Sequence, residues 1–141
     1  MKKSTEQIRK NLSEKGLKVT PQRISILEAI YNLNNHPTAE NIIEYIHISH
    51  PNIATGTVYK VLDILVENKL IKKVKTDRDI LRYDGVIENH HHLYCSECDL
   101  IEDYIDEELD ALLNDYFTKK KFKGFKLEDI VLQIRGTFDK C

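Results

Sequence analysis

The stretch Asn89-His90-His91-His92-Leu93-Tyr94-Cys95-Ser96-Glu97-Cys98 places three histidines beside a C-x-x-C pair within ten residues. Neutral imidazole and thiolate groups bind transition metals well because each presents a nitrogen or sulfur lone pair. In an extended segment alternate side chains share a face, so His90 and His92 point to one side and His91 to the other. We therefore expect one metal on the strand, held by His90 and His92, and a second at the turn, held by the cysteine pair. The alternative is a solvated histidine run followed by two ordinary thiols.

The composition excludes several classes of protein. Of the 141 residues, 41% are apolar and 31% are charged, which is typical of a globular protein and too apolar for a disordered one. No apolar run approaches the roughly 20 residues that a membrane-spanning helix needs. The polar start Met1–Glu6 has no apolar core of a secretory signal. Three cysteines are an odd count that argues against a secreted disulfide framework, so we expect a cytoplasmic protein without a membrane partner.

Charge is distributed unevenly along the chain. Residues 1–83 carry 14 Lys and Arg against 9 Asp and Glu, whereas residues 84–141 carry 7 against 14. A basic first part suits a polyanion such as DNA, and an acidic second part suits cations. We therefore expect a DNA-binding domain over residues 1–83 and a metal-binding and dimerisation domain over residues 84–141.

The first part has the pattern of short helices followed by a hairpin. Helices are expected over Ser4–Lys15, where Ile8 and Leu12 are four apart and Gly16 ends the pattern, and from Thr20-Pro21, Thr38 and Thr55. Thr20-Pro21 is a strong start, because threonine is a good N-cap and proline suits a first helical position. The segments on either side of Thr76–Asp79 alternate apolar and polar residues, which predicts two antiparallel strands. Together these elements predict a winged helix-turn-helix.

The helix from Thr55 is the candidate recognition helix. Its apolar residues recur at helical spacing on one face, while the other face is small, polar or basic. Such a helix enters the DNA major groove while the wing and basic side chains hold phosphates, and a dimer reads a two-fold symmetric operator. The expected contacts to double-stranded promoter DNA come from Thr55, Thr57, Tyr59, Lys60, Arg23 and Lys18. The alternative is a generic helical domain whose fourth helix is merely surface.

The second part predicts a small α/β unit, so the fold class is α+β. Strands are expected at His91–Cys95 and Leu100–Ile105, then a helix from Asp106 to about Lys121, then a strand from about Lys126 to Thr137. The apolar helix face and the edge strand predict pairing with a second copy, giving a homodimer.

Taken together, five segments resemble the ferric uptake regulator (Fur) family of metal-dependent bacterial repressors over nearly the whole chain. Their order and spacing are specific to the family. These segments are Lys18–Arg23, His36–Ala39, Gly56–Tyr59, Arg82–Asp84 and His90–Cys98.

The resemblance implies a regulatory metal site between the two domains, with ligands at His36, Asp84, His90, His92 and Asp103. Carboxylate and imidazole ligands suit Fe(II) or Mn(II), and Zn(II) would also bind. Because the ligands come from both sides of the linker, the metal would set the spacing of two recognition helices.

The branch of the family depends on the two carboxylates. Aspartate at positions 84 and 103 resembles the peroxide-sensing repressors (PerR), whereas the iron-sensing branch tends to have glutamate there, and Glu102 beside Asp103 blurs the distinction. In the peroxide-sensing branch, Fe(II) reacts with hydrogen peroxide and a ligand histidine is oxidised, which is expected here at His36 or His90. The alternative is an iron- or manganese-responsive repressor without peroxide sensing.

Two departures from the family pattern concern metal ligands. The family's structural zinc uses two C-x-x-C pairs, but here only Cys95, Cys98 and Cys141 match, because Phe138 stands at the fourth position. Three thiolates do not complete a tetrahedral site, so another ligand must join them or the zinc is lost. Ile130 stands where many relatives carry a histidine, so we expect no third metal site.

Two rivals from other functional classes are a zinc metalloenzyme and a metal buffer. A His-x-His pair with carboxylates can hold a catalytic zinc, but the sequence has no H-E-x-x-H signature and no evident general base. An enzyme would also leave the basic winged-helix part unexplained, and a metal buffer would bind metal without sequence-specific DNA affinity. We therefore expect no enzymatic activity and no organic cofactor.

Overall fold

The computed structural model describes residues 3–33, 36–76, 78–86 and 90–141 of the chain. Its contacts separate two compact units, Met1–Ile87 and Glu88–Cys141, which are described in turn. The domain limits of 1–83 and 84–141 stay a prediction.

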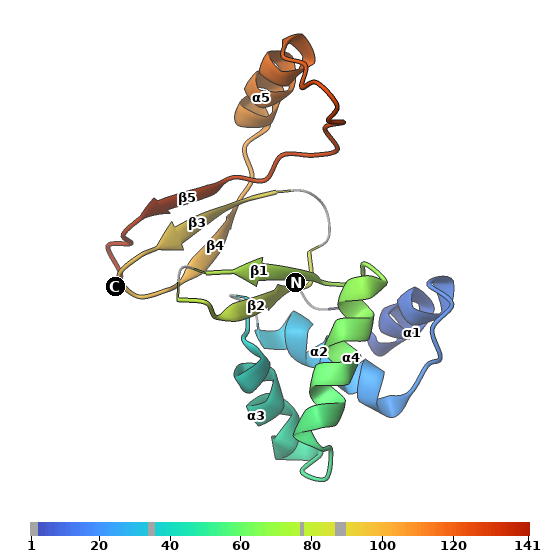
Figure 1. Ribbon diagram of the computed structural model, residues 1–141. Coiled ribbons are helices and arrows are strands. Elements are labelled where there is room, and N and C mark those ends of the chain that lie inside the picture. Colours follow the sequence, from blue (N-terminus) through green and yellow to red (C-terminus); the bar gives the residue numbers. More distant parts are fainter. Residues whose placement is uncertain (1–2, 34–35, 77, 87–89) are drawn as a thin grey trace. The chain divides into compact units, whose positions relative to one another are not determined.

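Four helices build the first unit: α1 (Thr5–Glu14), α2 (Pro21–Leu33), α3 (Ala39–Ser49) and α4 (Thr55–Glu67) (Figure 1). The starts of α1, α2 and α3 follow local signals, because Ser4 and Thr38 each form a capping box and the Thr20 hydroxyl accepts the Arg23 N–H at 3.2 Å. Helix α4 starts after Ala54 without a side-chain cap. Apolar residues of all four helices pack into a common core. Its fully buried members include Ile8, Leu12, Ile26, Leu27, Ile42, Val58, Leu62 and Leu65.

The predicted hairpin is present, and with the helices it forms the winged helix-turn-helix. Strands β1 (Lys72–Lys75) and β2 (Leu81–Asp84) pair antiparallel, with Lys72 opposite Asp84. The end of β2 is joined to the loop before α3, since the Tyr83 N–H donates to the Pro37 carbonyl at 2.9 Å. This link positions the last residue of the hairpin beside the start of α3.

Gly85 follows β2 at a close approach to α2. A Cβ at this position would lie 2.6 Å from the buried Tyr31 ring, so the chain leaves the hairpin where only glycine fits without displacing that ring.

The second unit is a three-stranded sheet with one helix. Strands β3 (His91–Cys95), β4 (Ile101–Tyr104) and β5 (Gln133–Gly136) lie in the order β4-β3-β5. β3 pairs antiparallel with β4 and parallel with β5, so the histidine-bearing strand is central.

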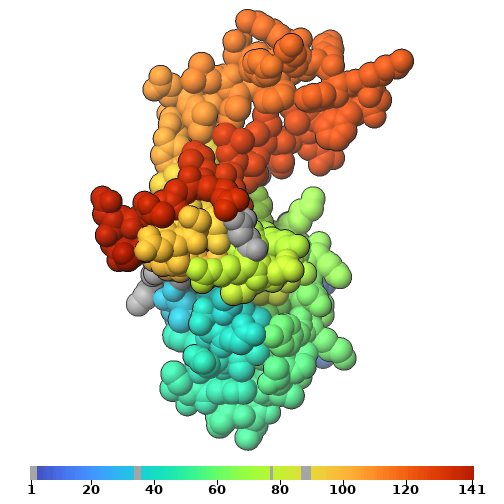
Figure 2. Space-filling model, turned by 60° about the vertical axis from the view of Figure 1, so that its left-hand side comes forward, coloured from blue at the N-terminus to red at the C-terminus, as the bar shows by residue number. Residues whose placement is uncertain are grey.

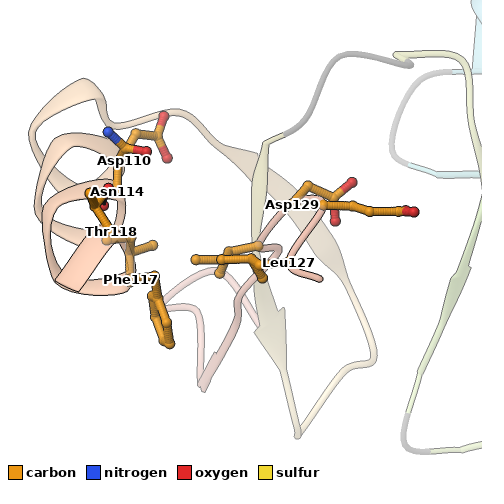
Figure 3. A pocket seen from close by; sticks show the side chains of 9 residues that line it. Asp110, Asn114, Phe117, Thr118, Leu127 and Asp129 are labelled. Atoms are coloured by element: carbon orange, nitrogen blue, oxygen red, sulfur yellow. Dashed lines mark hydrogen bonds between the residues drawn. The ribbon is translucent and has the colours of Figure 1, made fainter. Parts of the chain in front are cut away.

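The last strand is shorter than the sequence predicted. We expected a strand from about Lys126 to Thr137, but only Gln133–Gly136 pairs with β3. The alternation continues upstream, yet Leu127 and Ile130 line a groove against the helix instead of joining the sheet (Figure 3). The alternating pattern therefore overestimated the length of the hydrogen-bonded strand, and it did not predict burial either, because Leu127 is 38% and Ile134 is 41% exposed.

Helix α5 (Glu107–Lys119) begins as predicted after the N-cap Asp106. None of its residues is buried, and Figure 1 shows it extending away from the three strands of its own unit. Within the described ranges, no helix is long and apolar enough to cross a membrane.

Candidate metal sites and nucleic-acid interface

His36 and Asp84 form a buried pair in the first unit. His36 Nε2 lies 3.4 Å from Asp84 Oδ2, and both residues are less than a tenth exposed. His36 has a positive φ of 58°, a backbone conformation that is uncommon outside glycine. The Arg82 guanidinium donates to the His36 carbonyl at 3.1 Å, which ties this loop residue to the strand that carries Asp84. The structure thus brings together the two candidate ligands of this unit.

Two candidate histidine ligands of the second unit, His90 and His92, approach the carboxylate of the third candidate, Asp103. His90 Nε2 lies 2.9 Å and His92 Nε2 lies 3.7 Å from Asp103 Oδ1, and the two rings are 4.6 Å apart. The sheet register explains this, because His92 of β3 stands opposite Asp103 of β4. Alternate residues of a strand share a face, which places His90 and His92 on the same side as predicted.

His91 points to the other face of β3 and contacts two further segments. Its Nε2 lies 2.6 Å from Asp110 Oδ1 on α5, and its Nδ1 accepts the Leu132 N–H at 3.0 Å. Because Nδ1 accepts, the ring proton is on Nε2 and is donated to Asp110. Sequence alternation separated His91 from the ligands, but it could not identify partners 19 and 41 positions away.

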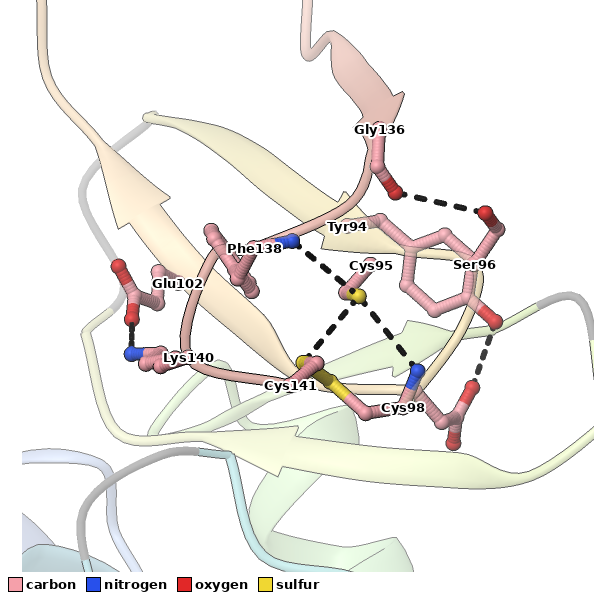
Figure 4. Close-up of a disulfide and its surroundings, with 10 residues drawn as sticks. Tyr94, Cys95, Ser96, Cys98, Glu102, Gly136, Phe138, Lys140 and Cys141 are labelled. Atoms are coloured by element: carbon pink, nitrogen blue, oxygen red, sulfur yellow. Dashed lines mark hydrogen bonds and ion pairs between the residues drawn. A yellow bond between two sulfur atoms is a disulfide. The ribbon is translucent and has the colours of Figure 1, made fainter.

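The three cysteines gather at the end of β3 (Figure 4). Cys98 and Cys141 form a disulfide, and Cys95 Sγ lies 3.4 Å from Cys141 Sγ. The resemblance to the family implied the grouping of these three residues, whereas the disulfide was not predicted. Phe138, which replaces the expected fourth cysteine, contributes its backbone N–H to Cys95 Sγ at 3.5 Å.

The environment of Cys95 favours the thiolate. Burial raises the pKa of Cys95, but backbone N–H groups of Cys98, Phe138 and Glu97 donate to its sulfur and bring the net pKa below the usual value. A thiolate is the form of cysteine that binds a metal. Reduction of the disulfide would therefore leave three sulfur ligands in one place.

In addition to the His91–Asp110 contact, a hydrogen bond between Tyr104 and Asp106 holds the start of α5. The Tyr104 hydroxyl donates to Asp106 Oδ2 at 2.6 Å, and the other carboxylate oxygen of Asp106 accepts the Leu109 N–H. The hydrogen bond from Tyr104 is the largest cause that lowers the pKa of Asp106, and the hydrogen bond from the Leu109 N–H lowers it further. The Tyr104–Asp106 hydrogen bond also raises the pKa of Tyr104. This contact was not visible in the sequence, where Asp106 was recognised only as a cap.

The candidate DNA-contacting residues of α4 lie on its exposed side. Tyr59 is 41% exposed and Lys60 is exposed, whereas Val58 and Val61 are buried in the core. Thr55 and Thr57 lie in the first turn, with Thr57 half-buried. The helix thus presents a polar and basic face to its surroundings.

Lys18 and Arg23 have different environments. Lys18 is exposed, but the partly buried Arg23 side chain donates to the Lys18 carbonyl at 2.8 Å. Arg23 therefore positions the loop before α2, and only a part of its guanidinium is available for another contact.

Comparison with known proteins finds relatives over most of the chain. The family model described as the ferric uptake regulator family matches residues 14–135. The peroxide operon regulator of Bacillus subtilis is 34% identical over 130 residues, covering 92% of this chain and 88% of that protein. The ferric uptake regulation protein of the same organism is 30% identical over 149 residues, covering 100% of this chain and 96% of that protein.

A solved structure shares the fold. The ferric uptake regulator of Helicobacter pylori, described as having three functional metal binding sites, superposes with a TM-score of 0.81 at 24% identity. The match covers 99% of this chain and 94% of that one.

Proposed function

Because this chain belongs to the ferric uptake regulator family, we propose that this metal-responsive regulator represses transcription as a dimer on promoter DNA and is released by hydrogen peroxide. The location would be the cytoplasm, where promoter DNA is accessible. The observation that carries the proposal is the pair of ligand groups, one in each unit, made of imidazoles and aspartates.

The regulatory site would combine both groups. His36 and Asp84 supply one nitrogen and one carboxylate, and His90, His92 and Asp103 supply two nitrogens and another carboxylate. This donor set fits Fe(II) or Mn(II), which accept mixed nitrogen and oxygen ligands, and it would also accept Zn(II). A metal held by both groups would favour one arrangement of the units and so one spacing of the α4 helices in a dimer.

DNA recognition would rest on α4 and the wing. The exposed Thr55, Tyr59 and Lys60 suit contacts in the major groove, while lysines of β1 suit phosphates. The net positive charge of residues 1–83 supports a polyanionic partner.

Peroxide sensing is supported by aspartate at both carboxylate positions and by the similarity to a peroxide operon regulator. Bound Fe(II) would supply the electron that opens the peroxide O–O bond. In the net reaction, one ring carbon of His36 or His90 gains an oxygen from hydrogen peroxide and one water is formed. The oxidised ring is a poorer ligand, so the two groups would no longer be joined and DNA would be released.

The second candidate is an iron- or manganese-responsive repressor without peroxide sensing. The 30% identity to a ferric uptake regulation protein favours it, and so does Glu102, because the iron-sensing branch tends to have glutamate at the carboxylate positions. Glu102 faces away from Asp103 on β4 and is ion-paired with Lys140. This pairing supports Asp103, and not Glu102, as the carboxylate of the regulatory site, and so favours the peroxide-sensing branch.

The cysteine cluster would hold a structural zinc in the reduced protein. Cys95, Cys98 and Cys141 supply three thiolates, and the fourth ligand must be water or a further side chain. This site is separate from the regulatory one and would act on stability.

The test is anaerobic binding of the protein to its own promoter region with Fe(II) or Mn(II), before and after hydrogen peroxide. We expect peroxide to release the iron form, to spare the manganese form and to add 16 Da, the mass of one oxygen, to a peptide that contains His36 or His90. If both forms stay bound and only chelation releases DNA, the second candidate is correct.

Ligand variants sharpen this test. His36→Ala and His90→Ala each remove one nitrogen ligand, so we expect metal affinity to fall roughly 100-fold or more, with DNA binding lost at matched metal. His50→Ala is the matched control, because His50 is an exposed C-cap residue. Repression by either ligand variant at the wild-type level would refute the assignment.

A further inference from the structure

The backbone of His36 has an unusual conformation, although its ring is a candidate metal ligand. Its φ of 58° lies in the left-handed region, which residues other than glycine adopt uncommonly. Such a conformation persists only where neighbouring groups hold it. The ring is buried, with Nε2 3.4 Å from Asp84 Oδ2. The position of this nitrogen therefore depends on the contacts that fix the chain just before α3.

Strand β2 supplies such contacts. The Tyr83 N–H donates to the Pro37 carbonyl at 2.9 Å, and Thr38 forms an antiparallel bridge with Arg82. The Arg82 guanidinium donates through Nη1 to the His36 carbonyl at 3.1 Å. Figure 2 shows the hairpin of β1 and β2, in yellow-green, against the helices of the same unit. The chain before α3 is thus joined to β2 over three successive residues.

Of these three contacts, only the hydrogen bond to the His36 carbonyl comes from a side chain. The other two use backbone atoms, so a substitution of Arg82 leaves them in place. A hydrogen bond from a charged donor is stronger than one between neutral groups, and the guanidinium donors have fixed directions. Arg82 therefore sets the orientation of the peptide group that follows His36.

We propose that Arg82 is a positioning residue for the regulatory metal, which keeps the His36 ring facing Asp84 before the metal binds. The inference rests on the proposed function, because it takes His36 and Asp84 as ligands. Ligands that are already in place bind more tightly, since less ordering accompanies binding. Arg82 itself does not bind the metal, because a guanidinium has donors and no acceptor.

The alternative role for Arg82 is a contact to a DNA phosphate. Lys73 and Lys75 of β1 are exposed and suit that role, whereas Arg82 is half-buried. Its Nη1 is also directed at the His36 carbonyl. These observations favour the positioning role, and the two roles predict different results for metal binding.

The test measures the Mn(II) affinity of the full chain by competition with a fluorescent chelator. Mn(II) prefers carboxylate and imidazole to thiolate, so it reports on the regulatory site and not on the cysteine cluster. Arg82→Met removes the donor and keeps most of the length of the side chain. We expect its Mn(II) dissociation constant to rise about 10- to 100-fold, the usual effect of losing a group that orients a metal ligand.

Two further variants calibrate this result. Arg82→Lys retains a charged donor, so we expect a smaller rise in the dissociation constant. Arg78→Met is the matched control, because Arg78 is an exposed arginine in the turn of the same hairpin, and we expect wild-type Mn(II) affinity. Circular dichroism of the metal-free proteins checks folding. If Arg82→Met does not fold, Arg82→Lys carries the comparison.

A double-mutant cycle with His36→Ala distinguishes positioning from a general structural role. If Arg82 acts through His36, Arg82→Met should change Mn(II) affinity less than about twofold once the imidazole is absent. The same loss of affinity in both backgrounds would overturn the inference. Wild-type affinity of Arg82→Met in the presence of His36 would also overturn it.

Other outcomes separate this inference from the proposed function. If Arg82→Met keeps wild-type Mn(II) affinity but loses DNA affinity, Arg82 is a phosphate contact and the inference alone is refuted. If His36→Ala itself leaves Mn(II) affinity unchanged, the regulatory site is wrongly assigned, and the proposed function and the inference fail together.

Discussion

At the scale of single residues, the alternation of His90, His91 and His92 assigns different tasks to neighbouring side chains. The outer two approach Asp103, while His91 joins β3 to α5 and to the chain before β5. His91 is 2% exposed and uses both ring nitrogens, so it is a structural residue next to candidate ligands. Its place among the other histidines concealed its bonding partners from sequence inspection.

His91→Leu should therefore destabilise the second unit without removing a candidate metal ligand. The Leu132 N–H would lose its acceptor, and an unsatisfied buried donor costs about 1–3 kcal/mol. Thermal unfolding of metal-free protein measures the change. Asp110→Ala is the comparison, and a smaller effect is expected because the Asp110 side chain is 53% exposed. Equal stability of His91→Leu and wild type would show that these bonds contribute nothing.

At the scale of elements, α5 depends on its first turn, because the helix buries none of its own residues. Asp106 caps the helix and is itself held by Tyr104. Three further acidic residues in the first turn interact favourably with the helix dipole. The helix thus relies on local polar contacts at one end.

Helicity of α5 should decrease in acid. The pKa of Asp106 is lowered on folding from its ordinary value of 3.8, first by the Tyr104 hydrogen bond. A lowered pKa means that its stabilisation is present above the ordinary value and is lost as the pH falls through the folded-state pKa. Circular dichroism between pH 5 and about pH 2 measures this loss.

Two substitutions identify the group responsible. Asp106→Asn keeps a capping oxygen but does not titrate, so we expect a flatter acid transition, whereas Asp106→Ala should lower helicity at every pH. An unchanged acid transition in Asp106→Asn would assign the pH dependence to other carboxylates.

At the scale of the whole molecule, Cys141 joins the cysteine cluster at the end of β3, although it lies far from Cys95 and Cys98 in the sequence. Cys141 lies 43 positions after Cys98, yet the two are bonded and Cys95 is in contact with both the pair and the turn. The parallel pairing of β5 with β3 brings the last residues back to this turn.

Reduction should convert this cluster into a zinc site. We expect elemental analysis to find one zinc per chain in the reduced protein. The unfolding temperature should also rise, because a ligand that binds only the native state stabilises it by about 2.7 kcal/mol at 100 times its dissociation constant. Cys95→Ser should lose both the metal and the stabilisation. Reduced wild-type protein that contains no zinc after incubation with the metal would exclude the site.

The sequence by itself determined the elements whose signals are local. Thr20, Thr38 and Asp106 mark helix starts because a cap acts within three residues, and the alternation around Thr76–Asp79 marks the wing because a hairpin pairs neighbouring segments. The grouping of the cysteines was predicted from resemblance to a family, and spacing alone supplied only the C-x-x-C pair. The candidate ligands of the regulatory metal site were likewise predicted from motifs shared with the family, and not from spacing.

Only the tertiary structure decided the contacts between distant segments. The strand before Thr137 was predicted too long because period-two alternation does not show which residues find a hydrogen-bonding partner in a neighbouring strand. The His91 contacts, the groove beneath α5 and the return of Cys141 depend on which strand lies beside β3, and that choice is made by packing over some 40 residues of chain. The periodicity of the sequence does not predict which strand pairs with β3, because many segments have the same local pattern.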